Sequence, residues 1–147
     1  MSHLRYKSYD GWGQTASEFH MSQVVRVPAG EIIKMSGQGG WDVSNGEVRS
    51  DLAEEYRQAF DNVQHTLMDE GGVGFFSVYK LVIYYTSENE LAMQYAKENM
   101  LRCFPDHHPV VTMIGVEKLA LPGMRVEVDA EAHMAKEQGK PNDECKA

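Results

Sequence analysis

Two side chains of this sequence have the chemistry of a general acid or base. Glu127 lies in the alternating segment Arg125-Val126-Glu127-Val128-Asp129, where its carboxylate could accept a proton if burial raised its pKa. His107 lies in Asp106-His107-His108-Pro109, and an imidazole titrates near neutral pH. A structural role is the alternative for each: a solvated ion pair for Glu127, and a hydrogen-bonded loop histidine for His107.

A glycine-rich segment, Ser36-Gly37-Gln38-Gly39-Gly40-Trp41-Asp42, has the composition of a loop that contacts a ligand. Glycine lets a backbone approach a ligand closely, and Trp41 could form one wall of a cleft. A turn without a ligand and a packing tryptophan are the alternatives. The glycine spacing is not that of a nucleotide-binding GxGxxG loop. The candidate ligand-binding residues in this segment are Ser36, Gly37, Gln38 and Trp41.

Hydrophobic periodicity predicts the elements that position these residues. The first helix follows Ser50 or Asp51, runs from Leu52 to Gly71-Gly72 and has Glu54 in capping-box position. A second capping box, Ser87 to Glu90, predicts a helix to Phe104. Strands are predicted at residues 21–27, 31–36, 75–85, 110–116 and 124–133.

This order, β-β-α-β-α-β-β, predicts an α+β fold with a mixed sheet and both helices on one face. The strand at 75–85 is expected to be largely buried on both sides. In the last strand, Met124, Val126 and Val128 alternate with polar residues, as in a strand with one buried and one wetter face. Because the uncovered face of so apolar a sheet needs a cover, an oligomer is expected.

Composition limits the classes of protein that the sequence allows. The chain has 147 residues, which fits a single domain with an ordered core at about 9–134 and a polar tail at 135–147. Its net charge of −8 and the absence of a basic cluster argue against nucleic acid as a partner. Two cysteines form no disulfide framework, and no Cys/His spacing predicts a metal site. With no signal peptide or membrane span expected, a cytoplasmic location is predicted.

Six segments, in order, resemble one family: Ser22 to Val25, Ser36 to Asp42, Gln58 to Val63, Val78 to Lys80, Gly115 to Leu119 and Arg125 to Ala130. Together they identify the sequence as similar to the YjgF/RidA (reactive-intermediate deaminase, L-PSP endoribonuclease-like) superfamily. The resemblance implies a chorismate-mutase-like fold, a homotrimer and a ligand cleft at each subunit interface. It implies hydrolysis of enamines or imines to a keto acid and ammonia, with no cofactor. Glu127 matches the family glutamate that holds the catalytic water.

The sequence departs from the deaminase pattern at three positions. Val111 occupies the position of the arginine that binds the substrate carboxylate in that branch, Met21 that of a common tyrosine, and Met113 that of a common cysteine. A valine cannot pair with a carboxylate, so either the substrate differs or another cation takes over. Arg102 and Arg125 are the candidates, with His107 a weaker one, and a solvated surface charge is the alternative for each. A related subgroup with SGQGGWD and PDH-x-P segments keeps the Asp106-His107 pair and likewise lacks the arginine.

Three functions follow as alternatives. The first is an enzyme that hydrolyses an enamine or imine, or processes a related small carbonyl metabolite, with Glu127 and His107 as catalytic residues. The second is a trimer that binds a small molecule without catalysis, in a cleft made apolar by Met21, Val111 and Met113. Convergence of Glu127 and His107 on one cavity would favour the first, and divergence the second. A ribonuclease or translation inhibitor is the third, and the acidic charge argues against it.

Overall fold

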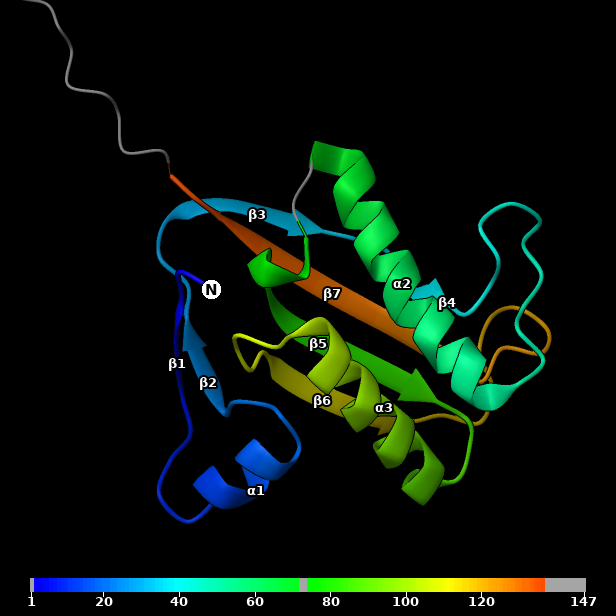
Figure 1. Ribbon diagram of the computed structural model, residues 1–147, viewed down its shortest axis with the longest axis horizontal. Helices are drawn as coiled ribbons and strands as arrows, with labels where there is room; N and C mark the ends of the chain where they lie inside the picture. Colours follow the sequence, from blue (N-terminus) through cyan, green and yellow to red (C-terminus); the bar gives the residue numbers. More distant parts are fainter. Residues whose placement is uncertain (1, 72–73, 137–147) are drawn as a thin grey trace, which may run out of the picture.

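The computed structural model describes residues 2–71 and 74–136. The predicted tail lies outside these residues except for Ala135, which ends the last strand, and Lys136. The elements follow along the chain (Figure 1) as β1 (Arg5–Lys7), α1 (Gly13–Glu18), β2 (Val24–Arg26), β3 (Gly30–Lys34), β4 (Gln38–Gly39), α2 (Leu52–Gly71), the 3₁₀ helix η1 (Phe75–Ser77), β5 (Val78–Tyr85), α3 (Asn89–Cys103), β6 (Val110–Gly115) and β7 (Val126–Ala135).

The main sheet is mixed and has the strand order β3-β7-β5-β6, with β4 also paired to β7. β7 runs antiparallel to β3, β4 and β5, whereas β5 and β6 are parallel because α3 connects them. β1 and β2 form a separate antiparallel pair. Ser22, just before β2, forms an isolated parallel β-bridge with Val110 at the start of β6. The predicted α+β class with a mixed sheet is confirmed.

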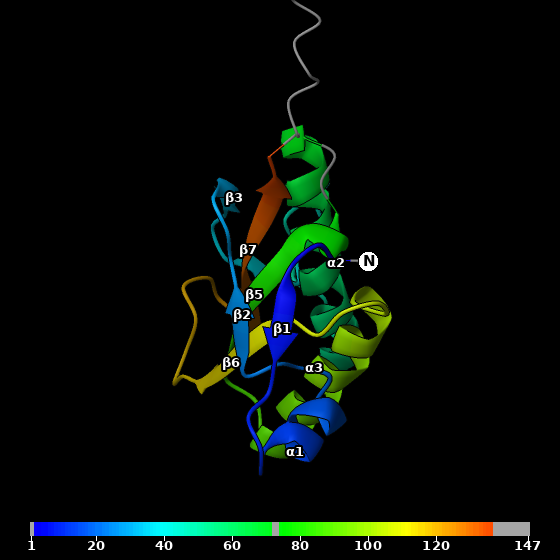
Figure 2. The same cartoon turned by 90° about the vertical axis from the view of Figure 1, so that its left-hand side faces the viewer.

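Both long helices cover the same face of the sheet (Figure 2), as predicted from the element order. In β7 the residues facing them are buried and alternate with half-buried polar residues on the other face, here called the open face. In β5 the alternation is the same: Leu81, Ile83 and Tyr85 are buried, whereas Lys80 and Val82 are only half-buried. The strand was expected to be largely buried on both sides; it is buried on the helix side and, from Lys80 onward, half-buried on the open face of the single chain.

The two helix starts have different outcomes. Asp51 caps α2, because its Oδ1 accepts a hydrogen bond from the backbone N–H of Glu54 at 3.0 Å. The capping box predicted for Ser87 is absent: Glu88 is the N-cap of α3, and no side chain caps it. The Ser87 hydroxyl instead lies 3.3 Å from the phenol oxygen of the buried Tyr56, so a tertiary contact has replaced the local one.

Three short elements were not predicted: β1, α1 and β4. Residues 75–77, predicted as strand, form η1 before β5 begins. The N-terminal elements are held by tertiary contacts rather than by a periodic pattern. His133 is fully buried, and its Nε2 donates a hydrogen bond to the Pro28 carbonyl oxygen at 3.0 Å. Its other ring nitrogen, Nδ1, is hydrogen-bonded to Nε2 of His3 at 2.7 Å. None of the described helices is long and apolar enough to cross a membrane.

Candidate functional site

An apolar cavity of about 180 Å³ lies between α3, β6 and the segment that joins α1 to β2. It contains all three positions at which the sequence departs from the deaminase pattern, Met21, Val111 and Met113. The cavity forms because α3 presents small and flexible side chains, Ala96 among them, to this part of the sheet. Its other lining residues are Phe19, Ile83, Met93, Ala96, Lys97 and Met100.

Glu127 lies on the open face of β7, opposite Tyr84 of β5 and Gly39 of β4. Its side chain extends over Gly37, so closely that a Cβ added at Gly37 would fall 2.7 Å from both Cγ and Cδ of Glu127. Among the described residues, no group donates a hydrogen bond to its carboxylate. The carboxylate is half-buried and available to a ligand or a water.

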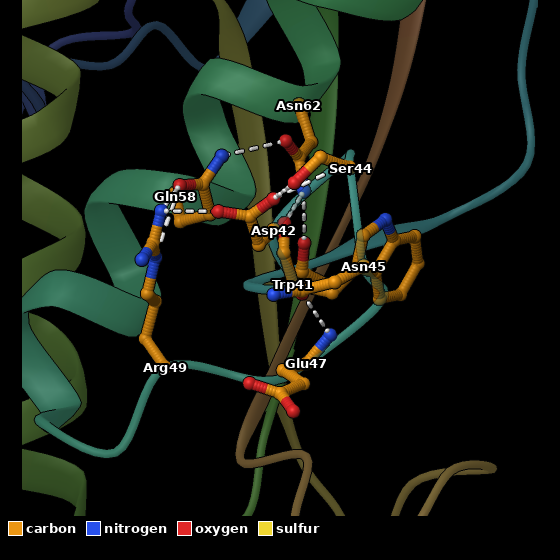
Figure 3. A network of polar contacts seen from close by, with 9 residues as sticks. Trp41, Asp42, Ser44, Asn45, Glu47, Arg49, Gln58 and Asn62 are labelled. Atoms are coloured by element: carbon orange, nitrogen blue, oxygen red, sulfur yellow. Dashed lines mark hydrogen bonds and ion pairs between the residues drawn. The ribbon is translucent and has the colours of Figure 1, made fainter.

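The glycine-rich segment is fixed to α2 by one buried amide. Asn62 donates from Nδ2 to the carbonyl oxygens of Gly39 and Trp41, both at 2.8 Å (Figure 3). Gln58 in turn donates to the Asn62 side-chain oxygen at 2.8 Å and accepts from Arg49, so the loop that follows Trp41 is tied to the same helix. This arrangement sets the backbone path that brings Gly37 beneath Glu127.

The other predicted residues of this segment divide between the two faces of the sheet. Ser36 and Gln38 line a shallow groove between β3 and the end of α2, on the helix side of the sheet. The ring of Trp41 packs where a Cβ at Gly39 would lie, beside Met124. Of the four residues predicted to bind a ligand in this segment, Gly37 lies beneath Glu127 and Trp41 lies on the same face over Gly39, the cross-strand partner of Glu127, whereas Ser36 and Gln38 lie elsewhere.

Glu127 and the apolar cavity lie on opposite faces of one sheet. Met113 pairs with Ile83 of β5, and Ile83 pairs with Val128 of β7, so these three side chains point toward the helices. Glu127, the neighbour of Val128 along β7, must point the other way. Within one chain, therefore, a ligand in the cavity cannot contact the Glu127 carboxylate.

His107 lies in a third location and is buried. Its Nε2–H donates to the carbonyl oxygen of Val78 at 2.7 Å, and its ring packs against Tyr6 and Phe104 at centroid distances of 5.6 and 5.5 Å. Burial lowers its pKa from the ordinary value of 6.5, so it is held in the neutral form. Since Val78 and the Glu127 partner Tyr84 are six residues apart on β5, the two sites are separated by about 20 Å.

The two arginines considered as replacement cations are engaged elsewhere. Arg125 donates from Nε to the fully buried carboxylate of Glu55 at 2.6 Å, and its backbone N–H donates to the same carboxylate at 2.7 Å. Arg102 pairs with Asp61 at 2.7 Å. Neither lines the cavity.

Sequence reasoning missed Lys97 and Asn62. Lys97 lines the cavity from α3. The sequence could have indicated this, because Lys97 lies four residues after Met93 and three before Met100, next to the apolar stripe of the helix. Asn62 is likewise a polar residue among the buried residues of α2, and it is 1% exposed. A polar residue within an apolar stripe was the signal in both cases.

The acidic row on the open face continues beyond Glu127. Tyr79 donates a hydrogen bond to Glu131, and burial together with the nearby Glu131 carboxylate raises the pKa of Asp129. Lys34 reaches Glu131 at 4.0 Å. Within residues 2–71 and 74–136, no group of three histidine, cysteine, aspartate or glutamate side chains is arranged to hold a metal ion.

Comparison with known proteins places this fold. The family model described as Endoribonuclease L-PSP matches residues 14–134. A search of curated proteins finds no match. Among solved structures, a Rid-family protein of unknown function, YyfB from Yersinia pestis, superposes with a TM-score of 0.79 at 24% identity, covering 89% of this chain and 98% of that one.

Two further structures from E. coli are similar over a shorter part of the chain. The YjgF gene product has a TM-score of 0.62 at 24% identity, and TdcF with bound serine has a TM-score of 0.63 at 19% identity. Each comparison covers 74% of this chain and 85% of the other. The fold and the match over most of the sequence define a Rid-type protein. The chain belongs to the YjgF/RidA superfamily, within the family described as Endoribonuclease L-PSP.

Proposed function

We propose that copies of this chain form a trimer in which Glu127 of one copy faces the apolar cavity of the next, and that the shared cleft hydrolyses an imine or enamine. The observation that carries the proposal is the location of these two features on opposite faces of one sheet. A cleft that uses both needs a second copy. A cyclic arrangement, in which one face of each copy meets a different face of its neighbour, provides this contact three times.

The open face has the character of a surface that a second copy covers. Ile32 and Ile114 are 45% and 39% exposed, and both point to this face, opposite His133 and Tyr84. The two side chains lie on the two edge strands of this face, β3 and β6, and exposed apolar side chains on a sheet face favour association. A second copy there would also enclose Glu127 within the cleft, away from bulk water.

Hydrolysis of an imine requires a positioned water and one group that moves protons. In the proposed step, the Glu127 carboxylate takes a proton from water as the water oxygen bonds to the imine carbon, and it delivers that proton to the nitrogen to give a carbinolamine. Glu127 then takes the hydroxyl proton of the carbinolamine and passes it to the nitrogen as the C–N bond breaks. The products are a carbonyl compound and ammonia, and no cofactor is consumed.

Binding without catalysis is the second candidate, and the position of His107 favours it. The buried imidazole hydrogen-bonds to Val78 and does not converge with Glu127, so the cleft would contain one acid-base residue rather than two. The apolar cavity also suits retention of a small molecule. Imine hydrolysis ranks first because one carboxylate is sufficient for the proton transfers.

The activity is tested by generating imines from leucine or methionine with an amino-acid oxidase and trapping the survivors with semicarbazide. The wild-type protein should reduce trapping, and Glu127→Gln should reduce the rate at least ~100-fold. Glu98→Gln is the matched control, because Glu98 is an exposed residue of α3 bound to Gln94. Equal trapping with and without wild-type protein would leave binding as the better account.

The shared cleft is tested by mixing two inactive variants. Glu127→Gln removes the carboxylate, and Ala96→Phe fills the cavity of the same chain. If the cleft lies between copies, unfolding and refolding the two variants together restores about a quarter of the wild-type activity, since only one cleft in four combines an intact carboxylate with an intact cavity. A cleft within one chain predicts no recovery at any mixing ratio.

A further inference from the structure

The cavity contains a single charged residue, and it is a lysine. Eight of the nine lining side chains are apolar, four of them methionine, and the ninth is Lys97. No lining residue other than Lys97 has a side chain that can make a conventional hydrogen bond. A ligand in this cavity therefore buries an apolar group and keeps any polar group at the position of Lys97.

Lys97 has no protein partner in the described part of the chain. The four ion pairs there join Lys34, Arg49, Arg102 and Arg125 to carboxylates, and none involves Lys97. The adjacent carboxylate of Glu98 accepts a hydrogen bond from Gln94 at 3.0 Å. Lys97 is exposed, which places it at the mouth of the cavity rather than in its interior. Its stem lines the opening while the ammonium group is free to meet an anion.

The size of the cavity limits the apolar group. A volume of about 180 Å³ is close to that of engineered apolar cavities of about 150 Å³ that bind benzene. The apolar part of the ligand is therefore about six carbons. Methionine side chains are flexible and polarizable, so the cavity accepts both linear and aromatic groups of this size.

We propose that the ligand is a small apolar monocarboxylate of about six carbons, with its carboxylate at Lys97 and its apolar group in the cavity. This inference rests on the proposed function for the location of the site and specifies its substrate class: the imine of an apolar acid. Zwitterionic compounds with an ammonium group are disfavoured, because the lining has no acceptor side chain for it and Lys97 repels it.

The proposal is tested by calorimetric titration of the full-length wild-type protein with hexanoate, hexanol and hexylamine at low ionic strength. Hexanoate should bind about 1.5- to fivefold more tightly than hexanol, the range for one exposed charge pair, and hexylamine most weakly. The preference should shrink in 0.5 M salt because the pair is screened. Lys97→Met should abolish the preference for hexanoate while it retains hexanol binding.

Two further variants control the experiment. Lys118→Met removes the same charge from an exposed residue that does not line the cavity, and it should leave the preference intact. Ala96→Phe should abolish binding of all three probes. Equal affinity for hexanoate and hexanol, a preference that persists in Lys97→Met, or no binding of any probe would each overturn the proposal. These titrations measure binding alone, so binding at Lys97 can be found even if mixing Glu127→Gln with Ala96→Phe restores no activity. Likewise, recovery of activity on mixing does not depend on a preference for hexanoate.

Discussion

Replacement of Gly37 by alanine should displace the Glu127 carboxylate without unfolding the protein. A Cβ at Gly37 would lie 2.7 Å from Cγ and Cδ of Glu127, whereas ordinary contacts begin near 3.4 Å. Oε1 of Glu127 lies closer still to this Cβ, so the glutamate side chain must withdraw by more than about 0.7 Å. It can do so because its far end is flexible, and alanine reduces the entropy of the unfolded chain. The free energy of unfolding should change by less than about 1 kcal/mol.

Activity should respond much more strongly than stability. A displacement on the order of 1 Å at a reacting group can reduce the rate about 100-fold. We therefore expect Gly37→Ala to reduce the rate of imine hydrolysis by about 10- to 100-fold.

Gly40→Ala is the matched comparison, because the atoms it meets cannot move away. Its Cβ would lie 2.8 Å from the carbonyl carbon of Glu55, which is part of the α2 backbone. We expect a loss of about 1–3 kcal/mol or more in the free energy of unfolding. Urea denaturation of both variants and the semicarbazide assay provide the two measurements. The reasoning is refuted if Gly40→Ala is as stable as wild type, or if Gly37→Ala unfolds as readily as Gly40→Ala.

Two further predictions concern buried ionisable groups. Arg125→Met removes the guanidinium partner of the fully buried Glu55 and should lower the free energy of unfolding by about 3 kcal/mol. Adding Glu55→Gln should recover part of this loss, and urea denaturation of the single and double variants measures both effects. Burial lowers the pKa of His3, His107 and His108 below the ordinary 6.5, so the unfolded chain binds more protons and stability should fall as pH drops below about 6.5. Urea midpoints between about pH 5 and 8 should show this slope, and a slope unchanged in His107→Asn would contradict the assignment to that residue.

The regular elements could be predicted because their sequence periods agree with their burial. Val126, Val128 and Ala130 alternate with Glu127 and Asp129, and the structure buries one set and leaves the other half-buried. The stripe of Tyr56, Phe60 and Val63 defined α2 in the same way. β4 has only two residues, Gln38–Gly39, which is too short for any period. It exists because it pairs with Val128 and Glu127, far along the chain.

The site was harder to predict because its residues depend on which face of the sheet each strand presents. The sequence indicated Glu127, Met21, Val111 and Met113, but their division between two faces follows from the pairing of β5 with β6 and β7. His107 also shows this limit, since its hydrogen bond to Val78 joins residues 29 apart in sequence. Lys97 was not among the predicted residues, since its place in a cavity depends on the position of Met21 and Val111 beneath α3.

The central position of β7 has a consequence for how the molecule is made. β7 is the last strand in the described part of the chain, yet it lies between β3 and β5 and also pairs with β4. Until the ribosome has released Val126–Ala135, β3 has no strand beside it and the β5-β6 pair lacks its antiparallel neighbour. Pairing across about 100 residues makes the closing step of folding non-local and slow. The nascent chain therefore exposes unpaired strand edges until β7 has been synthesised, a stage at which chaperone contact is most useful.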